Sequence, residues 1–296
     1  MRPKSGTVAL VGRPNAGKST LLNHLIAEKV AIVSDKPQTT RHRIIGILSA
    51  ERGQIVFFDT PGVHKPLHQM NRQMMQHAHD ALADADVVCL LNDASRPFGR
   101  GEAYLREMVS KVGAPKIVLL NKIDLVSKPR LLPRIEEYAT GGAFDEILPV
   151  SALTGEGCDR LLDLLWERLP AGPPLYDPEL YTIHPERFLA LETVREKVLL
   201  RTRDELPFSS AVTLEKWEEL PERGLVRLFV SILVERPGQK RIVIGKGGSN
   251  LKAIGTAARQ EIERLLGRKV YLELHVKVAP RWREDPRILA DLDRSL

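Results

Sequence analysis

Hydrophobic and polar positions follow one pattern up to about residue 169 and a different one beyond it. In the first part, short β-branched runs alternate with segments of helical periodicity, and several of the runs are continuously apolar. Such runs are typical of strands covered on both faces of an open sheet. The pattern predicts a doubly wound α/β domain with a mostly parallel sheet, and its strands are expected at 7–12, 43–50, 54–60, 86–93, 116–122 and 146–152.

The stretch "LPAGPPLYDP" ends this pattern, and its four prolines predict a stiff linker. The second part has an α+β order, in which a long helix and two strands precede a glycine-rich stretch, a further helix and a last strand. These elements are expected at about 185–203, 209–220, 225–235, 249–266 and 269–278. We therefore expect a first domain at 1–170, a linker at 171–180 and a second domain at 181–296.

The stretch "GRPNAGKS" follows a predicted strand and precedes a predicted helix, which is the context of a P-loop. Its two glycines let the backbone turn and approach phosphates, while Lys18 can reach the β- and γ-phosphates and Ser19 can ligate Mg²⁺. The loop residues expected to contact a nucleotide are Gly12, Arg13, Pro14, Asn15, Ala16, Gly17, Lys18, Ser19 and Thr20.

The stretch "NKID" predicts that the base is guanine. The carboxylate of Asp124 can accept hydrogen bonds from N1–H and the N2 amine of guanine, whereas adenine lacks this pair of donors. Asn121 would hold the loop and the stem of Lys122 would cover the base. "SAL" follows the next predicted strand and completes the expected base site with Ser151, Ala152 and Leu153.

Two further segments are expected at the phosphates. "DTPG" supplies Asp59, which would bind Mg²⁺ through water, and Gly62, whose amide would sense the γ-phosphate; Thr60 and Pro61 lie between them. The polar stretch 35–43 holds two threonines, of which we favour Thr40 over Thr39 as a Mg²⁺ ligand in a switch loop. The expected Mg²⁺ ligands are thus Ser19, Thr40 and Asp59, and the expected catalytic residues are Asn15, Lys18, Thr40 and Gly62.

A second glycine motif, "GKGG", is preceded by "RIVI" and followed by an amphipathic pattern, as in the Gly-x-x-Gly loop of a KH domain. Such a loop clamps about four nucleotides of single-stranded RNA. Residues 236–287 hold 13 Lys and Arg against 5 Asp and Glu, which is typical of a surface for a polyanion. The expected RNA contacts are Ile244, Gly245, Lys246, Gly247, Gly248 and Lys252.

The five nucleotide motifs, in this order, resemble the translation-factor-like branch of P-loop GTPases. "PQTTRHRI", "DTPGVHKP" and the KH-like half together resemble the Era family of bacterial ribosome-assembly GTPases. The resemblance covers nearly the whole chain. It implies hydrolysis of GTP to GDP with Mg²⁺, binding to the 3′ end of 16S ribosomal RNA, a role in maturing the 30S subunit, and peripheral contact with the cell membrane. We expect a monomer.

The residue after "DTPG" is Val63, where small signalling GTPases carry the glutamine that orients the attacking water. Valine cannot hydrogen-bond, so slow intrinsic turnover, on the order of 10⁻⁴ s⁻¹ or somewhat faster, is expected. Asn15 matches the asparagine that coordinates potassium in potassium-dependent relatives, and K⁺ bridging the phosphates would stabilise developing charge. The alternative is that Asn15 only hydrogen-bonds the loop.

Composition places the chain among soluble globular proteins, with 43% hydrophobic and 28% charged residues. No apolar run approaches the ~18 residues of a membrane span and no signal peptide is evident, which predicts a cytoplasmic protein. Cys89 and Cys158 are far apart, which favours buried thiols over a disulfide. The spacing of the four histidines after "DTPG" does not suit zinc, at His64, His68, His77 and His79.

Two other functions fit parts of the pattern. One is an RNA-binding assembly module whose nucleotide site is structural, which measured GTP turnover would distinguish from an enzyme. The other is a GTPase that acts at the membrane surface, because a basic patch also binds anionic lipid. Competition between liposomes and RNA would separate that function from RNA binding.

Overall fold

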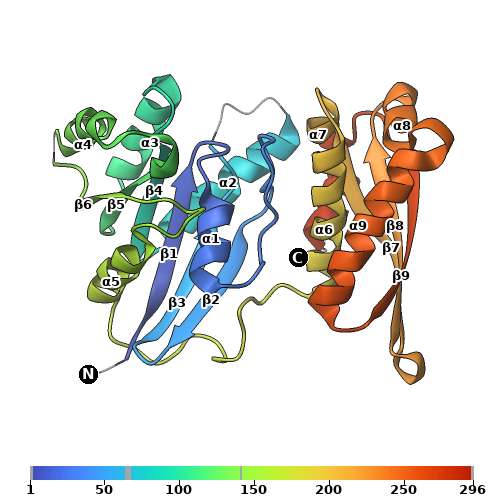
Figure 1. Ribbon diagram of the computed structural model, residues 1–296, viewed down its shortest axis with the longest axis horizontal. Coiled ribbons are helices and arrows are strands. Elements are labelled where there is room, and N and C mark those ends of the chain that lie inside the picture. Colours follow the sequence, from blue (N-terminus) through green and yellow to red (C-terminus); the bar gives the residue numbers. More distant parts are fainter. Residues whose placement is uncertain (1–2, 64–67, 141, 295–296) are drawn as a thin grey trace. The chain divides into compact units, whose positions relative to one another are not determined.

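The computed structural model describes residues 3–63, 68–140 and 142–294, and the chain forms two compact units (Figure 1). Unit 1 comprises Met1–Leu67 and Asn71–Ile183, and unit 2 comprises His68–Met70 and His184–Leu296. None of the helices in the described ranges is long and apolar enough to cross a membrane.

Unit 1 is built on a six-stranded sheet in the order β2-β3-β1-β4-β5-β6. All neighbouring pairs are parallel except β2 and β3, which are antiparallel, so the mostly parallel sheet is confirmed. Each predicted strand is present, although the first begins earlier and the last ends earlier than expected. The strands are β1 (Lys4–Gly12), β2 (Ile44–Ala50), β3 (Gly53–Asp59), β4 (Val87–Asp93), β5 (Lys116–Asn121) and β6 (Glu146–Pro149).

Helices cover both faces of this sheet, as the continuously apolar strands predict. In Figure 1, α1 (Lys18–Ile26) and α5 (Cys158–Arg168) lie on one face, and α2 (Gln69–Ala83), α3 (Arg100–Ser110) and α4 (Leu132–Ala139) lie on the other. Alternate residues of each strand therefore enter different cores. Ala9 and Val11, for example, pack with Ala78 and Leu82 of α2.

The sheet topology brings the nucleotide motifs together at one edge. β1 lies between β3 and β4, and β5 is the next strand, so the P-loop, "DTPG" and "NKID" all follow the carboxyl ends of neighbouring parallel strands. This edge is where open α/β sheets bind their ligands, at the point where the strand order reverses.

The proline-rich segment expected as a linker at 171–180 is held by unit 1. Both Leu175 and Tyr176 donate their backbone amides to Gln54 Oε1, each at 2.8 Å, and Gln54 is fully buried. The amide nitrogen of Gln54 donates back to the Tyr176 carbonyl at 3.0 Å. Unit 1 extends to Ile183, so this segment belongs to unit 1 rather than lying between the two units.

Unit 2 has the predicted element order and a three-stranded sheet, β7-β8-β9, with β7 antiparallel and β9 parallel to β8. Helices α6 and α9 pack on this sheet, and α9 buries one residue in every four, at Ile254, Ala258, Ile262 and Leu266. A helix, α8, precedes the glycine loop. The elements are α6 (Glu186–Arg201), α7 (Leu206–Ser209), β7 (Ser210–Leu220), β8 (Leu225–Val234), α8 (Pro237–Ile244), α9 (Ser249–Leu266), β9 (Lys269–Val278) and α10 (Pro286–Arg294).

Candidate nucleotide site and Gly-x-x-Gly loop

The loop between β1 and α1 has a backbone that only glycine can follow at two positions. Gly17 has φ 95°, and a Cβ there would lie 2.2 Å from Nδ2 of Asn121. A Cβ on Gly12 would lie 2.6 Å from the carbonyl oxygen of Leu91. The loop therefore runs close to both β4 and the "NKID" segment, and α1 begins directly after it at Lys18.

Lys18 is buried inside this loop and is only 5% exposed. Its Nζ donates to the carbonyls of Gly12 and Arg13 at 3.4 and 3.3 Å. Burial lowers the pKa of Lys18, and the nearby Asp59 carboxylate opposes this shift. An ammonium group held by carbonyls alone is poorly compensated. A phosphate at this point would restore the charged form, as expected for a P-loop lysine.

Three oxygen-bearing side chains meet beside Lys18. Ser19 Oγ lies 2.9 Å from Thr40 Oγ1 and donates to Asp59 Oδ2 at 2.5 Å, and Thr40 Oγ1 donates to the same oxygen at 3.3 Å. The other carboxylate oxygen, Asp59 Oδ1, is buried and has no hydrogen-bond partner among the described residues. Burial raises the pKa of Asp59, against the effects of Lys18, Ser19 and Thr40. This hard oxygen set, with one acceptor unused, fits Mg²⁺.

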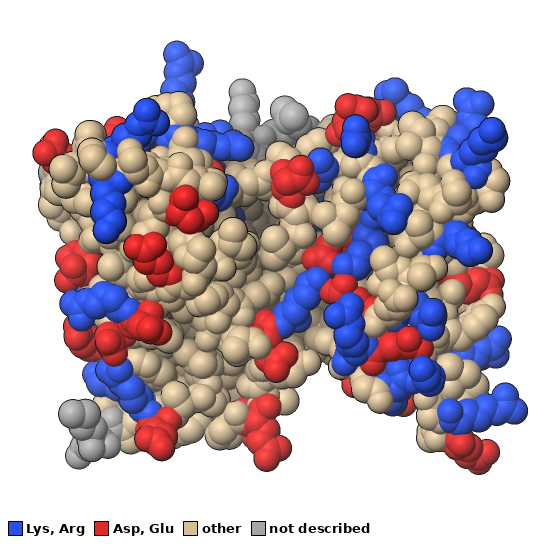
Figure 2. Space-filling model, viewed as in Figure 1, with Lys and Arg blue, Asp and Glu red and all other residues tan. Residues whose placement is uncertain are grey.

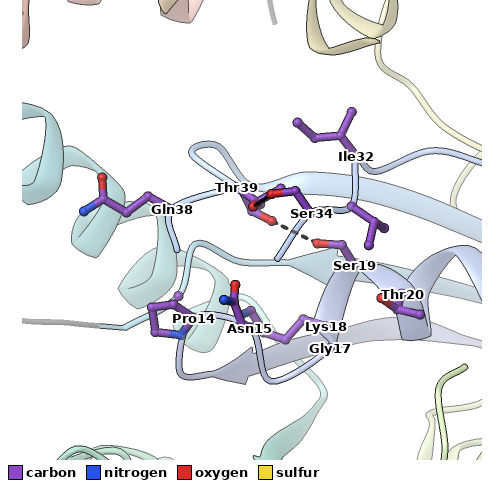
Figure 3. A pocket seen from close by; sticks show the side chains of 13 residues that line it. Pro14, Asn15, Gly17, Lys18, Ser19, Thr20, Ile32, Ser34, Gln38 and Thr39 are labelled. Carbon is purple, nitrogen blue, oxygen red and sulfur yellow. Dashed lines mark hydrogen bonds between the residues drawn. The ribbon is translucent and has the colours of Figure 1, made fainter. Parts of the chain in front are cut away.

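The two neighbouring threonines have different surroundings. Thr39 Oγ1 donates to the Lys36 carbonyl at 2.6 Å and lies 2.6 Å from Ser34 Oγ, within its own loop. Thr40 instead reaches the P-loop serine, as described above. The segment that carries both threonines lines the same pocket as the P-loop side chains Pro14, Asn15, Lys18, Ser19 and Thr20 (Figure 3). The geometry therefore supports Thr40 as the residue that meets Mg²⁺.

The "DTPG" segment follows β3 and passes directly over the P-loop. A Cβ on Gly62 would lie 2.6 Å from the backbone nitrogen of Pro14, so only glycine permits this approach. Thr60 is fully buried and donates its hydroxyl to the Leu10 carbonyl at 2.8 Å, which is a structural role. Pro61 is also buried. Val63 is 4% exposed, packs in the core, and donates its amide to the Gly12 carbonyl at 3.1 Å.

Two P-loop side chains are held by residues outside the loop. Asn15 has a left-handed backbone with φ 64°, and its Nδ2 donates to the Asp35 carbonyl at 2.6 Å. Arg13 pairs with Glu102 of α3 at 2.9 Å, and a Cβ on Gly101 would meet the Arg13 side chain at 2.8 Å. The Arg13 guanidinium thus joins the loop to the first turn of α3. Only the backbone of Arg13 is then left to contact a nucleotide.

The "NKID" segment is joined to the P-loop and to the segment after β6. Asn121 Nδ2 donates to the Ala16 carbonyl at 2.7 Å, and its Oδ1 accepts from the Ala152 amide at 2.9 Å. Ser151 Oγ donates to Asp124 Oδ1 at 2.6 Å. Asp124 is exposed, so its second oxygen can face a base, and the three predicted segments come together as expected from the sheet order.

Lys122 and Leu153 border this base position. Lys122 has a left-handed backbone with φ 67°, and its Nζ contacts Asp93 Oδ2 at 2.7 Å. Partial burial would raise the pKa of Asp93, but hydrogen bonds from Lys122 and Ser95 outweigh it and lower the pKa. The amino group is thereby fixed and the stem is left to cover a ring. Leu153, two residues after Ser151, is 75% exposed and offers an apolar surface.

In unit 2, the Gly-x-x-Gly loop joins α8 to α9. Gly245, Gly247 and Gly248 all have positive φ, at 75°, 59° and 79°. A Cβ on Gly245 would meet Asn250 atoms at 2.8 and 2.9 Å, whereas one on Gly247 or Gly248 would meet nothing within 4 Å. Lys246 and Gly247 are exposed. The loop therefore offers an open glycine surface at the start of α9, while Ile244 is half-buried against the core.

A groove of about 420 Å³ continues from this loop between α9 and β9. It contains the expected Gly248 and Lys252, and its other members were not predicted from the sequence. Their signal was the helical spacing of small and basic residues after the glycine loop. These further members are Leu251, Gly255, Thr256, Arg259, Leu272 and Leu274.

The two cysteines are buried and unreactive near neutral pH. Cys89 and Cys158 are buried free thiols, and burial raises the pKa of Cys89 to about 12 and that of Cys158 to about 11. Both thiols are therefore protonated near neutral pH and poor nucleophiles. Of the four histidines considered for zinc, His64 lies outside the described residues.

Comparisons with known proteins agree with both units. Residues 7–122 match the family model described as 50S ribosome-binding GTPase, and residues 205–283 match the KH domain model. GTPase Era of Heliobacterium modesticaldum is 48% identical over 286 residues, covering 97% of this chain and 95% of that protein. GTPase Era of Geobacter metallireducens is 46% identical, covering 98% of this chain and 97% of that protein.

Solved structures show the same relation over the whole chain. A crystal structure of Era in complex with MgGDPNP and nucleotides 1506–1542 of 16S ribosomal RNA has a TM-score of 0.95 and 39% identity, and covers 99% of this chain and 100% of that one. An Aquifex aeolicus Era variant bound to GDP and AlF₄⁻ has a TM-score of 0.93 and 40% identity, with the same coverage. The P-loop site, the KH unit and the full-length similarity together place this chain in the Era family of GTPases.

Proposed function

We propose that this protein is a GTP-operated switch that binds the 3′-end region of 16S ribosomal RNA through unit 2 and assists maturation and assembly of the 30S subunit. The observation that carries this proposal is the presence, in one chain, of a guanine-nucleotide site and an open Gly-x-x-Gly loop. The relative crystallised with both MgGDPNP and a 16S RNA segment supports the same pairing of ligands.

The proposed roles follow the geometry of the nucleotide site. Lys18 and the loop amides bind the β- and γ-phosphates, and Asp124 reads guanine while Asn121 holds the loops together. Ser19, Thr40 and Asp59 hold Mg²⁺, Asp59 through water, and the ion supplies positive charge to the phosphates. Val63 is turned into the core, so positioning of the attacking water falls to backbone groups such as the Gly62 amide.

A crosslinking experiment tests the RNA partner. Purified protein loaded with GDPNP is added to a lysate of its own cells, crosslinked to RNA and recovered for sequencing. We expect reads to concentrate at the 3′ end of 16S ribosomal RNA. A protein carrying Gly247→Asp, treated in parallel, is expected to lose this enrichment. Reads spread evenly over unrelated RNAs, or concentrated on the large subunit, would refute the proposed target.

We also propose that a potassium ion assists hydrolysis at Asn15. Asn15 Nδ2 is occupied by the Asp35 carbonyl, but its Oδ1 accepts no hydrogen bond from the described residues. Asn15 lines the same pocket as Lys18 and Ser19, so its neutral Oδ1 is available there as a ligand. Such ligands suit a monovalent cation, which would add positive charge where an arginine finger acts in other GTPases.

GTP turnover is expected to be roughly tenfold or more faster in potassium than in sodium at equal ionic strength. This ratio corresponds to an activation free energy lower by about 1.4 kcal/mol or more. Asn15→Gly should remove the difference. Glycine keeps the left-handed φ of 64° without strain, so this variant removes only the side chain, whereas Asn15→Ala also strains the loop. Equal wild-type rates in the two salts would exclude a role for potassium.

We further propose that the protein works as a cytoplasmic monomer with weak, peripheral contact to the inner face of the membrane. Lys and Arg side chains that gather over α8 and the loop support the contact, at Arg236, Lys240, Arg241 and Lys246 (Figure 2). Anionic lipid attracts such a cluster by about 1 kcal/mol per basic residue. Liposomes that fail to compete with RNA for the protein would argue against membrane contact through this surface.

A further inference from the structure

A second basic groove lies on unit 2, between α6 and α9. Its volume is about 650 Å³, and it is lined from α6 and the turn after it by Lys197, Leu200, Arg201 and Arg203, and from α9 by Asn250, Ala257, Gln260, Glu261 and Arg264. The groove between α9 and β9 shares none of these lining residues. Helix α9 thus carries a groove on each flank.

The groove carries four basic side chains and one acidic side chain. Lys197 is used internally, since it contacts Glu196 at 2.6 Å and also pairs with Glu261. Arg201, Arg203 and Arg264 are exposed, and no carboxylate among the described residues lies within salt-bridge distance of them. Three exposed guanidinium groups without counter-ions give this groove a positive potential, which attracts a polyanion.

The groove is continuous with the Gly-x-x-Gly loop. Asn250 lines the groove, and its Nδ2 donates to the carbonyls of Ile242 and Val243 at 3.3 and 3.2 Å, directly before the loop. From Asn250 to Arg264 the helix rises about 21 Å, at 1.5 Å per residue. An RNA strand that leaves the loop can therefore follow the arginines along α9.

We propose that the α6–α9 groove is a second RNA-backbone site, which holds phosphates of nucleotides that flank those clamped at the Gly-x-x-Gly loop. The proposal rests on the proposed RNA binding of unit 2 and adds a second contact surface to it. Anionic lipid or an acidic protein segment would match the charge as well. The continuity with the loop favours RNA.

The test compares two RNA probes in the full-length protein: nucleotides 1506–1542 of 16S ribosomal RNA, as in the relative's structure, and a hexanucleotide from the 3′ end. The variant combines Arg201→Gln, Arg203→Gln and Arg264→Gln. It should bind the long RNA about tenfold or more weakly and the hexanucleotide unchanged. The slope of log K against log salt should flatten by about 0.7 for each phosphate contact that is lost.

Two matched variants control for charge and for folding. Arg100→Gln, Arg130→Gln and Arg223→Gln remove the same net charge from exposed arginines elsewhere, and should leave both affinities unchanged. The three groove arginines changed to lysine should keep most of the long-RNA affinity. GTP turnover and thermal unfolding of the free protein, measured for every variant, should match the wild type.

Failure of this proposal differs from failure of RNA binding itself. A wild-type protein that binds neither probe would refute RNA binding by unit 2. If the wild type binds both probes and the groove variant binds the long RNA with wild-type affinity and salt slope, the groove is not an RNA site. A variant that keeps RNA binding but loses phosphatidylglycerol vesicles would likewise overturn the proposal, in favour of lipid.

Discussion

Asp124→Asn is expected to lower the affinity for GTP by on the order of 10³-fold or more and to make xanthosine triphosphate the preferred nucleotide. Ser151 Oγ holds one carboxylate oxygen of Asp124 at 2.6 Å, which leaves the other free for the base. An asparagine places a donor where guanine also has its N2 amine, so a buried pair of donors goes unsatisfied. Xanthine carries an acceptor oxygen there and restores the match.

Calorimetric titration with GTP, XTP and ATP measures this exchange. Ser151→Ala is the matched control, because it loosens the carboxylate without changing which groups it can bind. It should weaken GTP binding by about tenfold and leave GTP preferred over XTP. Asp159→Asn removes the same charge from the exposed start of α5 and should have no effect. GTP preference retained in Asp124→Asn would show that the base is read by other residues.

Gly247→Asp is expected to weaken RNA binding by about 100-fold or more while GTP turnover of the free protein is unchanged. A carboxylate at this exposed position would face the RNA backbone. Juxtaposed like charges cost several kcal/mol of binding free energy, and about 1.4 kcal/mol corresponds to a tenfold change in affinity. The fold should survive, because a Cβ at Gly247 meets nothing within 4 Å. Aspartate also tolerates a left-handed φ such as the 59° found here.

Gly247→Asn separates charge from shape in this test. Asparagine has nearly the size of aspartate and the same tolerance of left-handed backbone, but it carries no charge. We expect it to lose much less affinity than Gly247→Asp. Lys246→Ala should lose still less affinity. The slope of log K against log salt should flatten by the amount expected for about one lost phosphate contact. Single-stranded RNA bound at wild-type strength by Gly247→Asp would rule out the loop as the RNA site.

Most of the fold could be predicted because its signals are local. Short runs of apolar and β-branched residues marked all six strands of unit 1, and the amphipathic period bounded by glycines marked α9 at Ser249–Leu266. The P-loop is equally local, since a strand, a glycine turn and a helix occur within a short stretch. Strand ends were less certain. β6 ends at Pro149, three residues before the predicted end, because Ser151 and Ala152 instead bond Asp124 and Asn121 of the base site.

Placement of the proline-rich segment was not predictable from its composition. Prolines indicated a stiff spacer, but the segment is held by a buried glutamine more than 120 positions earlier in the chain. Gln54 lies in a strand whose other residues are mostly apolar, and nothing local marks it as the partner of Leu175 and Tyr176. Its fully buried amide requires hydrogen bonds, and the segment supplies them.

The sequence alone determined the chemistry of the two sites, because glycines, a lysine, hydroxyls and carboxylates at fixed spacing already specify phosphate, Mg²⁺, guanine and an RNA backbone. Only the tertiary structure gave Thr40 and Thr39 different partners, turned Asn15 toward Asp35, and placed Arg201, Arg203 and Arg264 in one groove. Adjacent hydroxyls are equivalent along a chain. Residues about 60 positions apart become neighbours only when the helices that carry them pack together. Their proximity therefore depends on the folded core and is not visible in any local sequence pattern.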